Sequence, residues 1–193
     1  MSKSKALNRR EVVAALLERR GGLLVVAGLG APAWDCAAAG DHPLTFPLWG
    51  AMGSAAMIGL GLALAQPKRR VLVVTGDGEM LMGLGALATI GVERPPNLAL
   101  VVFDNGSYGE TGMQASHTQA GVSLSGVARA CGIEAVFDIA DEAALNEFAM
   151  RLHAFDRTVF ARIAIHADEP PRVLPLRDGV HLKNRFRRAV GVE

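Results

Sequence analysis

Cysteine is scarce in this chain of 193 residues. It has only Cys36 and Cys131, and no CxxC pair. The missing pair argues against a zinc centre or a dithiol redox motif. Two thiols in a chain without an apolar leader at its N-terminus are typical of reduced cysteines, so we expect a cytoplasmic protein.

A strong charge of either sign is also lacking. Twenty basic and 19 acidic residues leave a formal net charge of +1, which gives no reason to expect nucleic acid or an anionic membrane as a partner. The most apolar stretch, residues 51–65, contains three glycines and is shorter than the roughly 20 residues of a membrane span. We therefore expect neither a nucleic-acid partner nor a membrane partner.

Aromatic residues make up 5% of the chain, whereas half of it is hydrophobic. A core filled with small aliphatic side chains suits a close-packed α/β domain. The length suits one domain, so residues 1–193 are predicted to form a single domain.

Short apolar runs alternate with segments of helical periodicity. The runs predict buried strands at residues 23–27, 71–74, 98–103, 135–137 and 158–165. Helices are expected between Asn8 and Gly21 and at residues 34–39, 53–66, 79–91, 124–131, 141–153 and 181–190, with extended chain or loop at 41–50 and 107–123. This alternation predicts a doubly wound parallel sheet with helices on both faces, in which ligands bind beyond the carboxyl ends of the strands.

One predicted strand runs directly into Gly76-Asp77-Gly78. Glycines let the backbone approach a ligand closely, and the amides that begin the next helix favour phosphate. A carboxylate would repel that phosphate unless a metal ion lay between them, as Mg²⁺ commonly does. Taken alone, this tripeptide is better explained as a strand-to-helix turn in which Asp77 caps the helix.

Asn105 strengthens the metal interpretation. It follows the next strand, 28 residues after Asp77, with room for one helix between them. If the two strands are parallel neighbours, both side chains lie at the same sheet edge. An amide oxygen suits Mg²⁺ or Ca²⁺, and Gly106 lets the chain turn so that a following carbonyl can face the ion.

These two motifs together resemble the metal and diphosphate motif of thiamine-diphosphate enzymes. The resemblance implies that Asp77, Asn105 and the Ser107 carbonyl hold Mg²⁺, Ca²⁺ or Mn²⁺. The family's usual Asn-Asn pair is Asp104-Asn105 here, which leaves the ligand position intact. The contacts that it implies with thiamine diphosphate are Gly30, Gly50, Met52, Gly76, Asp77, Gly78, Glu79, Asn105, Ser107, Tyr108 and Gly109.

A second match lies at residues 49–53, Trp-Gly-Ala-Met-Gly. In the family, the first glycine of this loop offers its carbonyl to the aminopyrimidine, and a bulky apolar residue two positions later holds the cofactor in a bent form. Gly50 and Met52 match these roles. Met52 by itself would be interpreted as a core residue.

Within this family, the chain is most similar to the small diphosphate-binding (beta) subunits of sulfopyruvate decarboxylase and the matching half of phosphonopyruvate decarboxylase. The similarity covers nearly the whole chain and implies a carboxy-lyase acting on a 2-oxo acid. Family members need a glutamate from a pyrimidine-binding domain, which this chain lacks. Neither Glu79 nor Glu110 is assigned that role, so we expect a pyrimidine-binding partner subunit in a hetero-oligomer, with self-association as the alternative for the isolated chain. His117, in the loop, is a candidate proton donor or contact for an acidic substrate, although a lone loop histidine is more often solvated.

Other functions stay open. Carboligation or oxidative decarboxylation would use the same cofactor, and a non-catalytic cofactor-binding subunit would share the same motifs. A nicotinamide-binding domain is less favoured, because Gly28-Leu29-Gly30 is followed by Ala33 at the third position of G-x-G-x-x-G, although that position tolerates alanine.

Overall fold

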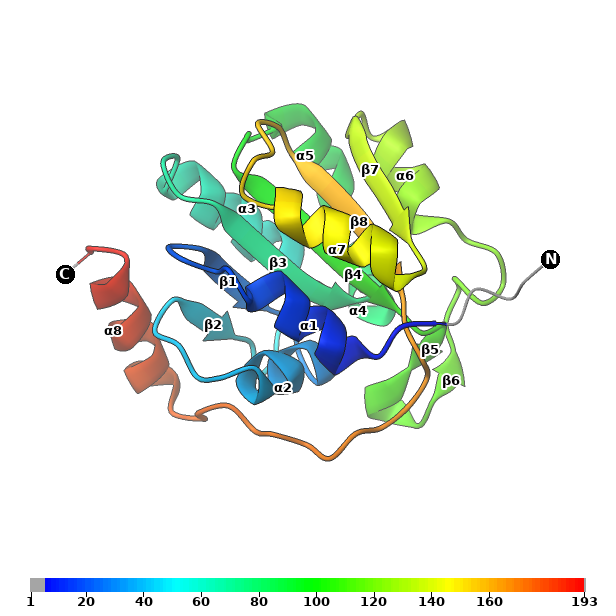
Figure 1. Cartoon of the computed structure of the whole chain (residues 1–193), viewed down its shortest axis with the longest axis horizontal. Helices are drawn as coiled ribbons and strands as arrows, with labels where there is room; N and C mark the ends of the chain where they lie inside the picture. Colours follow the sequence, from blue (N-terminus) through cyan, green and yellow to red (C-terminus); the bar gives the residue numbers. More distant parts are fainter. Residues whose placement is uncertain (1–5, 193) are drawn as a thin grey trace.

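A single sheet of six parallel strands forms the centre of the computed structural model, which describes residues 6–192 (Figure 1). The strands are β1 (Leu24–Ala27), β2 (Thr45–Pro47), β3 (Val71–Gly76), β4 (Leu98–Asp104), β7 (Ala135–Ile139) and β8 (Val159–Ala164). Their order is β2-β1-β3-β4-β8-β7, and every neighbouring pair is parallel. The predicted doubly wound sheet is confirmed.

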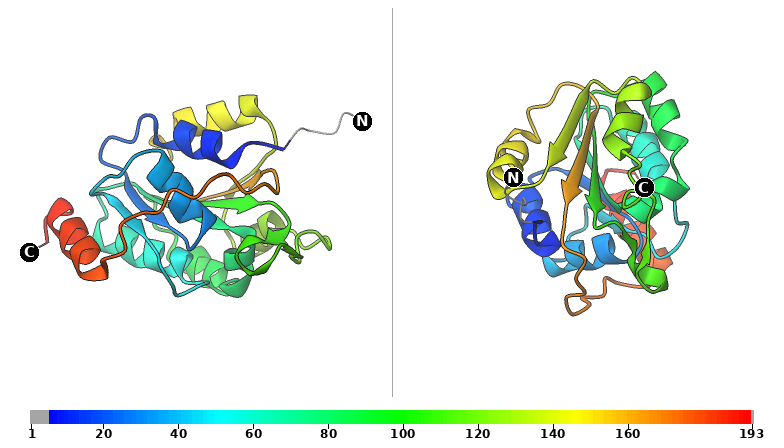
Figure 2. Two further views of the ribbon diagram at one scale, coloured as in Figure 1. Left: turned by 90° about the horizontal axis from the view of Figure 1, so that it is seen from below. Right: turned by 90° about the vertical axis from the view of Figure 1, so that its right-hand side faces the viewer.

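Helices cover both faces of this sheet (Figure 2). One face carries α1 (Arg9–Leu17), α2 (Ala31–Ala38) and α7 (Glu142–Arg151), and the other carries α3 (Ala55–Ala65), α4 (Asp77–Met82), α5 (Ala86–Glu93) and α6 (Leu124–Ala130). Successive strand residues point to opposite faces, so Val25 belongs to the first core and Leu24 and Val26 to the second. Both faces are buried, which explains why the strands are continuous apolar runs.

Short polar side chains fix where several helices begin. The Asn8 side chain accepts hydrogen bonds from the amides of Arg10 and Glu11, and Asp141 caps α7 by accepting from the Ala144 amide. These are the start residues that the sequence predicts. Such caps satisfy amides that have no partner within the helix.

The helix expected at residues 79–91 is in fact two helices, and that prediction was wrong. α4 ends at Met82 and α5 begins at Ala86. Gly83 separates them, and its α-carbon lies so close to Gly53 that an added Cβ would be 1.9 Å from the Gly53 carbonyl oxygen. A tertiary contact with the loop before α3 thus decides this break.

Two segments expected to be loop or extended chain contain regular structure. Residues 41–50 include β2, an edge strand, where Pro47 is tolerated. Residues 107–123 contain the antiparallel pair β5 (Ser107–Tyr108) and β6 (Gln114–Ala115), joined across the 3-10 turn η1 (Gly109–Thr111). This hairpin folds the long segment back towards the sheet edge.

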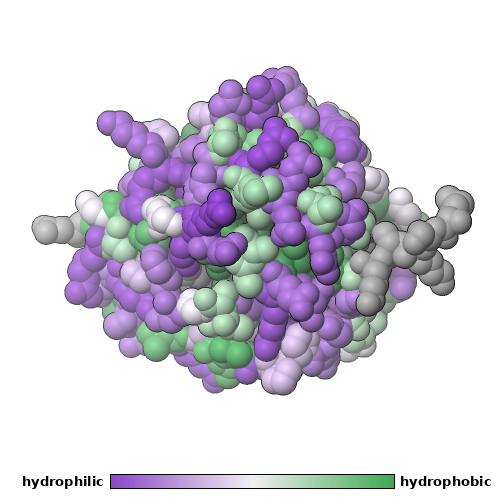
Figure 3. Space-filling model, viewed as in Figure 1, coloured by the Kyte–Doolittle hydropathy of each residue, from purple (hydrophilic) through white to green (hydrophobic). Residues whose placement is uncertain are grey.

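The C-terminal helix α8 (Gly179–Ala189) lies beside β2, after the chain runs past α2 (Figure 1). The Phe186 ring meets Phe46 edge-on at 5.4 Å between centroids, and Arg185 pairs with Asp41 at 2.6 Å. The face shown in Figure 3 is mostly hydrophilic, with scattered apolar residues. Within residues 6–192, no helix has both the length and the apolar character needed to cross a bilayer.

Candidate functional site

A pocket opens at the carboxyl edge of the sheet, between the ends of β1 and β3. The chain leaves β1 towards α2 on one face of the sheet and leaves β3 towards α4 on the other. This is the position at which doubly wound sheets bind ligands. The turns after β1, β3 and β4 supply most of its wall. The lining residues are Arg9, Leu29, Ala31, Pro32, Met52, Gly76, Asp77, Gly78, Glu79, Phe103, Asn105, Ser107, Tyr108, Gly109, Glu110, Thr111 and Ile165. Of the contacts predicted from the sequence, only Gly30 and Gly50 are absent from this wall.

Asp77 is the first residue of α4, and its side chain is buried. Its Oδ2 accepts a hydrogen bond from the Ser116 hydroxyl, and the Thr118 hydroxyl oxygen lies 3.2 Å from the same atom. Burial raises the pKa of Asp77, the hydroxyl of Ser116 opposes that rise, and the nearby carboxylate of Asp104 adds to it. The ionised form of Asp77 therefore lies in surroundings that favour an added cation.

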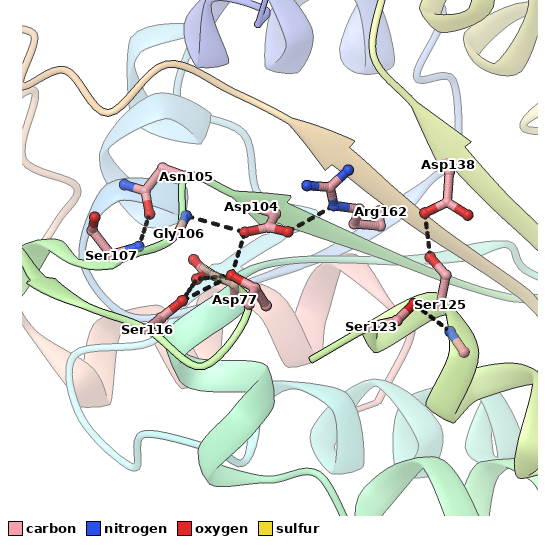
Figure 4. Close-up of polar contacts among 12 residues, drawn as sticks. Asp77, Asp104, Asn105, Gly106, Ser107, Ser116, Ser123, Ser125, Asp138 and Arg162 are labelled. Carbon is pink, nitrogen blue, oxygen red and sulfur yellow. Dashed lines mark hydrogen bonds and ion pairs between the residues drawn. The ribbon is translucent and has the colours of Figure 1, made fainter. Parts of the chain in front are cut away.

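Asp104 is the last residue of β4 and lies between Asp77 and Arg162 in a chain of polar contacts (Figure 4). Its Oδ1 is 2.7 Å from the Thr118 hydroxyl, and its Oδ2 pairs with Arg162 Nε at 2.6 Å. A hydroxyl has one proton, and the shorter distance favours donation from Thr118 to Asp104 rather than to Asp77. The Arg162 guanidinium balances the charge that Asp104 brings where the family usually has asparagine.

Asn105 lines the pocket one residue beyond β4. Its Oδ1 accepts a hydrogen bond from the Ser107 amide at 2.9 Å. An amide oxygen has two lone pairs, so this bond leaves one for a metal ion. Gly76 pairs with Phe103 across β3 and β4, so Asp77 and Asn105 follow adjacent strand ends.

Glu79 is a buried acid at the inner wall of the same pocket. Its Oε2 accepts from the Thr75 hydroxyl at 2.8 Å. Burial raises the pKa of Glu79, opposed by hydrogen bonds from Thr75 and from backbone amides in the surrounding loops. Oε2 would lie 2.1 Å from a Cβ added to Gly28, so glycine is required for the turn after β1 to pass this carboxylate.

The two predicted glycines outside the wall have different surroundings. Gly30 caps α2 with φ +77°, and a Cβ there would lie 2.2 Å from an oxygen of Glu110. Its neighbours Leu29 and Ala31 line the pocket. Gly50 is exposed and has open space around it, whereas Met52 reaches the pocket wall and is 42% exposed.

Tyr108 and His117 lie together at the rim. The Tyr108 hydroxyl is 3.3 Å from His117 Nδ1, and the Tyr108 ring covers Gly78, where a Cβ would be 2.6 Å from a ring carbon. His117 is exposed and does not line the pocket. Its role as a proton donor stays a prediction.

Sequence reasoning missed four polar residues at this edge: Ser116, Thr118, Arg162 and Arg9. Ser116 and Thr118 flank His117, and their hydroxyls bracket the carboxylates of Asp77 and Asp104. Arg162 did give a signal, because a charged residue inside an otherwise apolar strand needs a partner. Arg9 gave no signal, since basic residues commonly begin solvated helices.

The family described as "Thiamine pyrophosphate enzyme, C-terminal TPP binding domain" matches residues 31–163, which include every predicted metal and diphosphate residue except Gly30. The chain therefore belongs to the thiamine pyrophosphate enzymes.

Its relatives narrow this class. The beta subunit of sulfopyruvate decarboxylase from Methanococcus maripaludis is 31% identical over 187 residues, 95% of this chain and 98% of that one. The corresponding subunit from Methanothermobacter thermautotrophicus is 41% identical over 150 residues, 76% of this chain and 77% of that one. Phosphonopyruvate decarboxylase from Streptomyces viridochromogenes is 40% identical over 152 residues, which cover 76% of this chain but 37% of that longer protein.

A solved structure gives independent support for the fold. An X-ray structure of a protein assigned to the thiamin diphosphate-dependent enzymes of Mycobacterium smegmatis superposes with a TM-score of 0.72 at 19% identity. The match covers 84% of this chain and 32% of that one. The expected cofactor, thiamine diphosphate, and the expected class, a subunit of a thiamine-diphosphate-dependent carboxy-lyase, are confirmed by the sequence relatives.

Proposed function

We infer that this chain is the diphosphate-binding subunit of a 2-oxo acid decarboxylase and that it holds the cofactor through a divalent metal. One observation carries the inference. Asp77 and Asn105, which follow adjacent parallel strands, line the same pocket as the glycine-rich turns. When bound, thiamine diphosphate supplies the electron sink for loss of CO₂, and the protein supplies position and electrostatics.

The oxygen atoms at this edge fit Mg²⁺ or a similar ion. Both hydroxyl contacts of Asp77 reach Oδ2, which leaves Oδ1 without a side-chain donor. Asn105 Oδ1 keeps a free lone pair, and the Ser107 carbonyl follows in the same turn. Within the described residues, no group of three His, Cys, Asp or Glu side chains could hold a metal. The ion would therefore rely on amide and backbone oxygens beside Asp77, a hard-oxygen set that Mg²⁺ accepts.

The catalytic glutamate is proposed to come from a partner subunit. Glu79 is buried beneath the turn after β1 and bound to Thr75, and Glu110 lies against Gly30. Both acids therefore belong to the diphosphate half of the site. Met52 and Met82 are 42% and 52% exposed, and Gly53, next to Met52, packs against the end of α4. A partner's pyrimidine-binding domain seated over this apolar rim would exclude water from the cofactor and complete the site.

The proposed substrate is a small 2-oxo acid that carries a second acidic group. Support comes from the names of the relatives, sulfopyruvate and phosphonopyruvate decarboxylases. A screen for CO₂ release over 2-oxo acids, with the co-purified partner, Mg²⁺ and thiamine diphosphate, would identify the substrate. Product analysis in the same screen separates simple decarboxylation from carboligation or oxidative decarboxylation.

The metal assignment is tested by Asp77→Ala. We expect it to abolish Mg²⁺-dependent binding of thiamine diphosphate, measured by titration calorimetry, while circular dichroism shows a folded protein. Asp138→Ala is the matched control, because Asp138 pairs with Ser125 and Arg129 at the end of β7, outside the pocket. Undiminished, metal-dependent affinity in Asp77→Ala would refute the assignment.

A further inference from the structure

Arg9 lies at the start of α1, outside the part of the chain that matches the family. Its side chain is buried, yet it lines the pocket with Asp77 and Asn105. The other charged residues in the wall, Asp77, Glu79 and Glu110, are acidic. Arg9 is therefore the only cationic side chain among the lining residues, in a pocket proposed to hold a diphosphate.

The one ion pair that Arg9 makes within residues 6–192 is poorly aligned. Its Nε is 3.4 Å from Asp35 Oδ2, but hydrogen-bond geometry is not met, and both atoms are buried without a hydrogen-bond partner. No hydrogen bond from the other guanidinium nitrogens of Arg9 is found within residues 6–192. A buried guanidinium with unused donors is costly unless an anion completes its surroundings.

Asp35 has a second cationic partner besides Arg9. Arg10 donates to Asp35 Oδ1 at 3.3 Å and also to the carbonyl of Pro171. Two arginines thus face one buried carboxylate. The charge of Asp168 raises the pKa of Asp35, but Asp168 is exposed and pairs with neither Arg9 nor Arg10. Of the two arginines, Arg9 is the one that lines the pocket and can meet an anion bound there.

The start of α2 faces the same place. Gly30 caps this helix without any side-chain hydrogen bond, and Ala31 and Pro32 line the pocket. An uncapped helix start favours an anion, and Arg9 lines the same pocket as Ala31 and Pro32. We propose that Arg9 binds the terminal phosphate of the cofactor diphosphate, beside the start of α2. This inference rests on the proposed function.

Three variants of the full chain test this role: Arg9→Met, Arg9→Lys and Arg10→Met. Calorimetry with Mg²⁺ would compare thiamine diphosphate, inorganic pyrophosphate and thiamine monophosphate. Loss of charge-assisted hydrogen bonds should raise the Kd of the two diphosphates roughly 10- to 100-fold in Arg9→Met. The monophosphate should be little affected, Arg9→Lys should recover part of the loss, and Arg10→Met should stay close to wild type.

The alternative outcomes are distinct. Wild-type affinity for thiamine diphosphate in Arg9→Met would overturn the role of Arg9 and leave the proposed function standing. An increase in KM for the 2-oxo acid, with unchanged cofactor affinity, would also overturn it and place Arg9 on the substrate acid. Failure of the wild-type chain, tested together with its co-purified partner subunit, to bind any of the three ligands would overturn the proposed function together with this inference. If Arg9→Met does not fold, Arg9→Met with Asp35→Asn removes the buried charge imbalance and repeats the test.

Discussion

Gly83, at the break between α4 and α5, should control the loop that carries Met52. An added Cβ would lie 1.9 Å from the Gly53 carbonyl oxygen and 2.9 Å from its carbon. Real Cβ contacts are not shorter than 3.0 Å, so in Gly83→Ala the two backbones must separate by at least about 1.1 Å, the difference between these distances. No side chain can rotate away to relieve the clash, because both partners are main chain.

We expect Gly83→Ala to lower the free energy of unfolding by about 3 kcal/mol, at the upper end of the usual cost of overpacking. The loop at residues 50–53 would move away from the pocket. A misplacement of about 1 Å near a reacting group can cost up to about 100-fold in activity. We therefore also expect a clear loss of thiamine diphosphate affinity, although Gly83 lies outside the pocket wall.

Gly85 provides the matched control two residues away. Its backbone is helical (φ −60°, ψ −20°), and nothing lies within 4 Å of an added Cβ. Gly85→Ala should therefore raise stability by about 0.4–1 kcal/mol, mainly by restricting the unfolded chain. Urea titration of both variants measures the difference. Equal stabilities of the two variants, or unchanged cofactor affinity in Gly83→Ala, would refute the reasoning.

Two further predictions concern buried groups away from the pocket. Burial raises the pKa of Cys36 to about 12, and the neighbouring Asp35 adds to the rise. A thiol reagent at pH 8 should therefore modify Cys131 in the native protein and reach Cys36 only on unfolding. The unfolded Cys36 thiol ionises near its ordinary pKa of 9.0, whereas the folded thiol stays protonated. The free energy of unfolding should therefore fall above pH 9.0 by up to about 1.4 kcal/mol per pH unit. The same dependence on pH in a Cys36→Ala variant would contradict this. The Asn97 amide nitrogen lies within 3.0 Å of the carbonyl oxygens of Ala63, Gln66 and Arg69, which its two hydrogens share, at the end of α3 and in the turn before β3. Asn97→Ala should therefore cost about 1–3 kcal/mol in urea unfolding. A smaller cost than that of Glu147→Ala, which removes the exposed pair with Arg151, would count against it.

The sequence by itself determined the parallel sheet and brought together the residues of the proposed metal site. Continuous apolar runs define strands that are covered on both faces, and Gly76-Asp77-Gly78 and Asn105-Gly106 follow two of them directly. Because parallel neighbours present their carboxyl ends at one edge, the spacing of Asp77 and Asn105 was enough to predict that they line one pocket. The helix caps at Asn8 and Asp141 were also local signals, readable from the residue type and the periodicity that follows.

Only the tertiary structure decided what surrounds these residues. Ser116 meets Asp77 across 39 positions of the chain, and Arg162 meets Asp104 across 58. Neither contact follows from a local pattern, because it depends on how the hairpin folds back and on which strand lies next to β4. The split between α4 and α5 likewise comes from the backbone of Gly53. Asp77 and Asn105 could thus be predicted from the strand ends that they follow. Their polar surroundings, which include Ser116, Thr118 and Arg162, depend on strand order and packing.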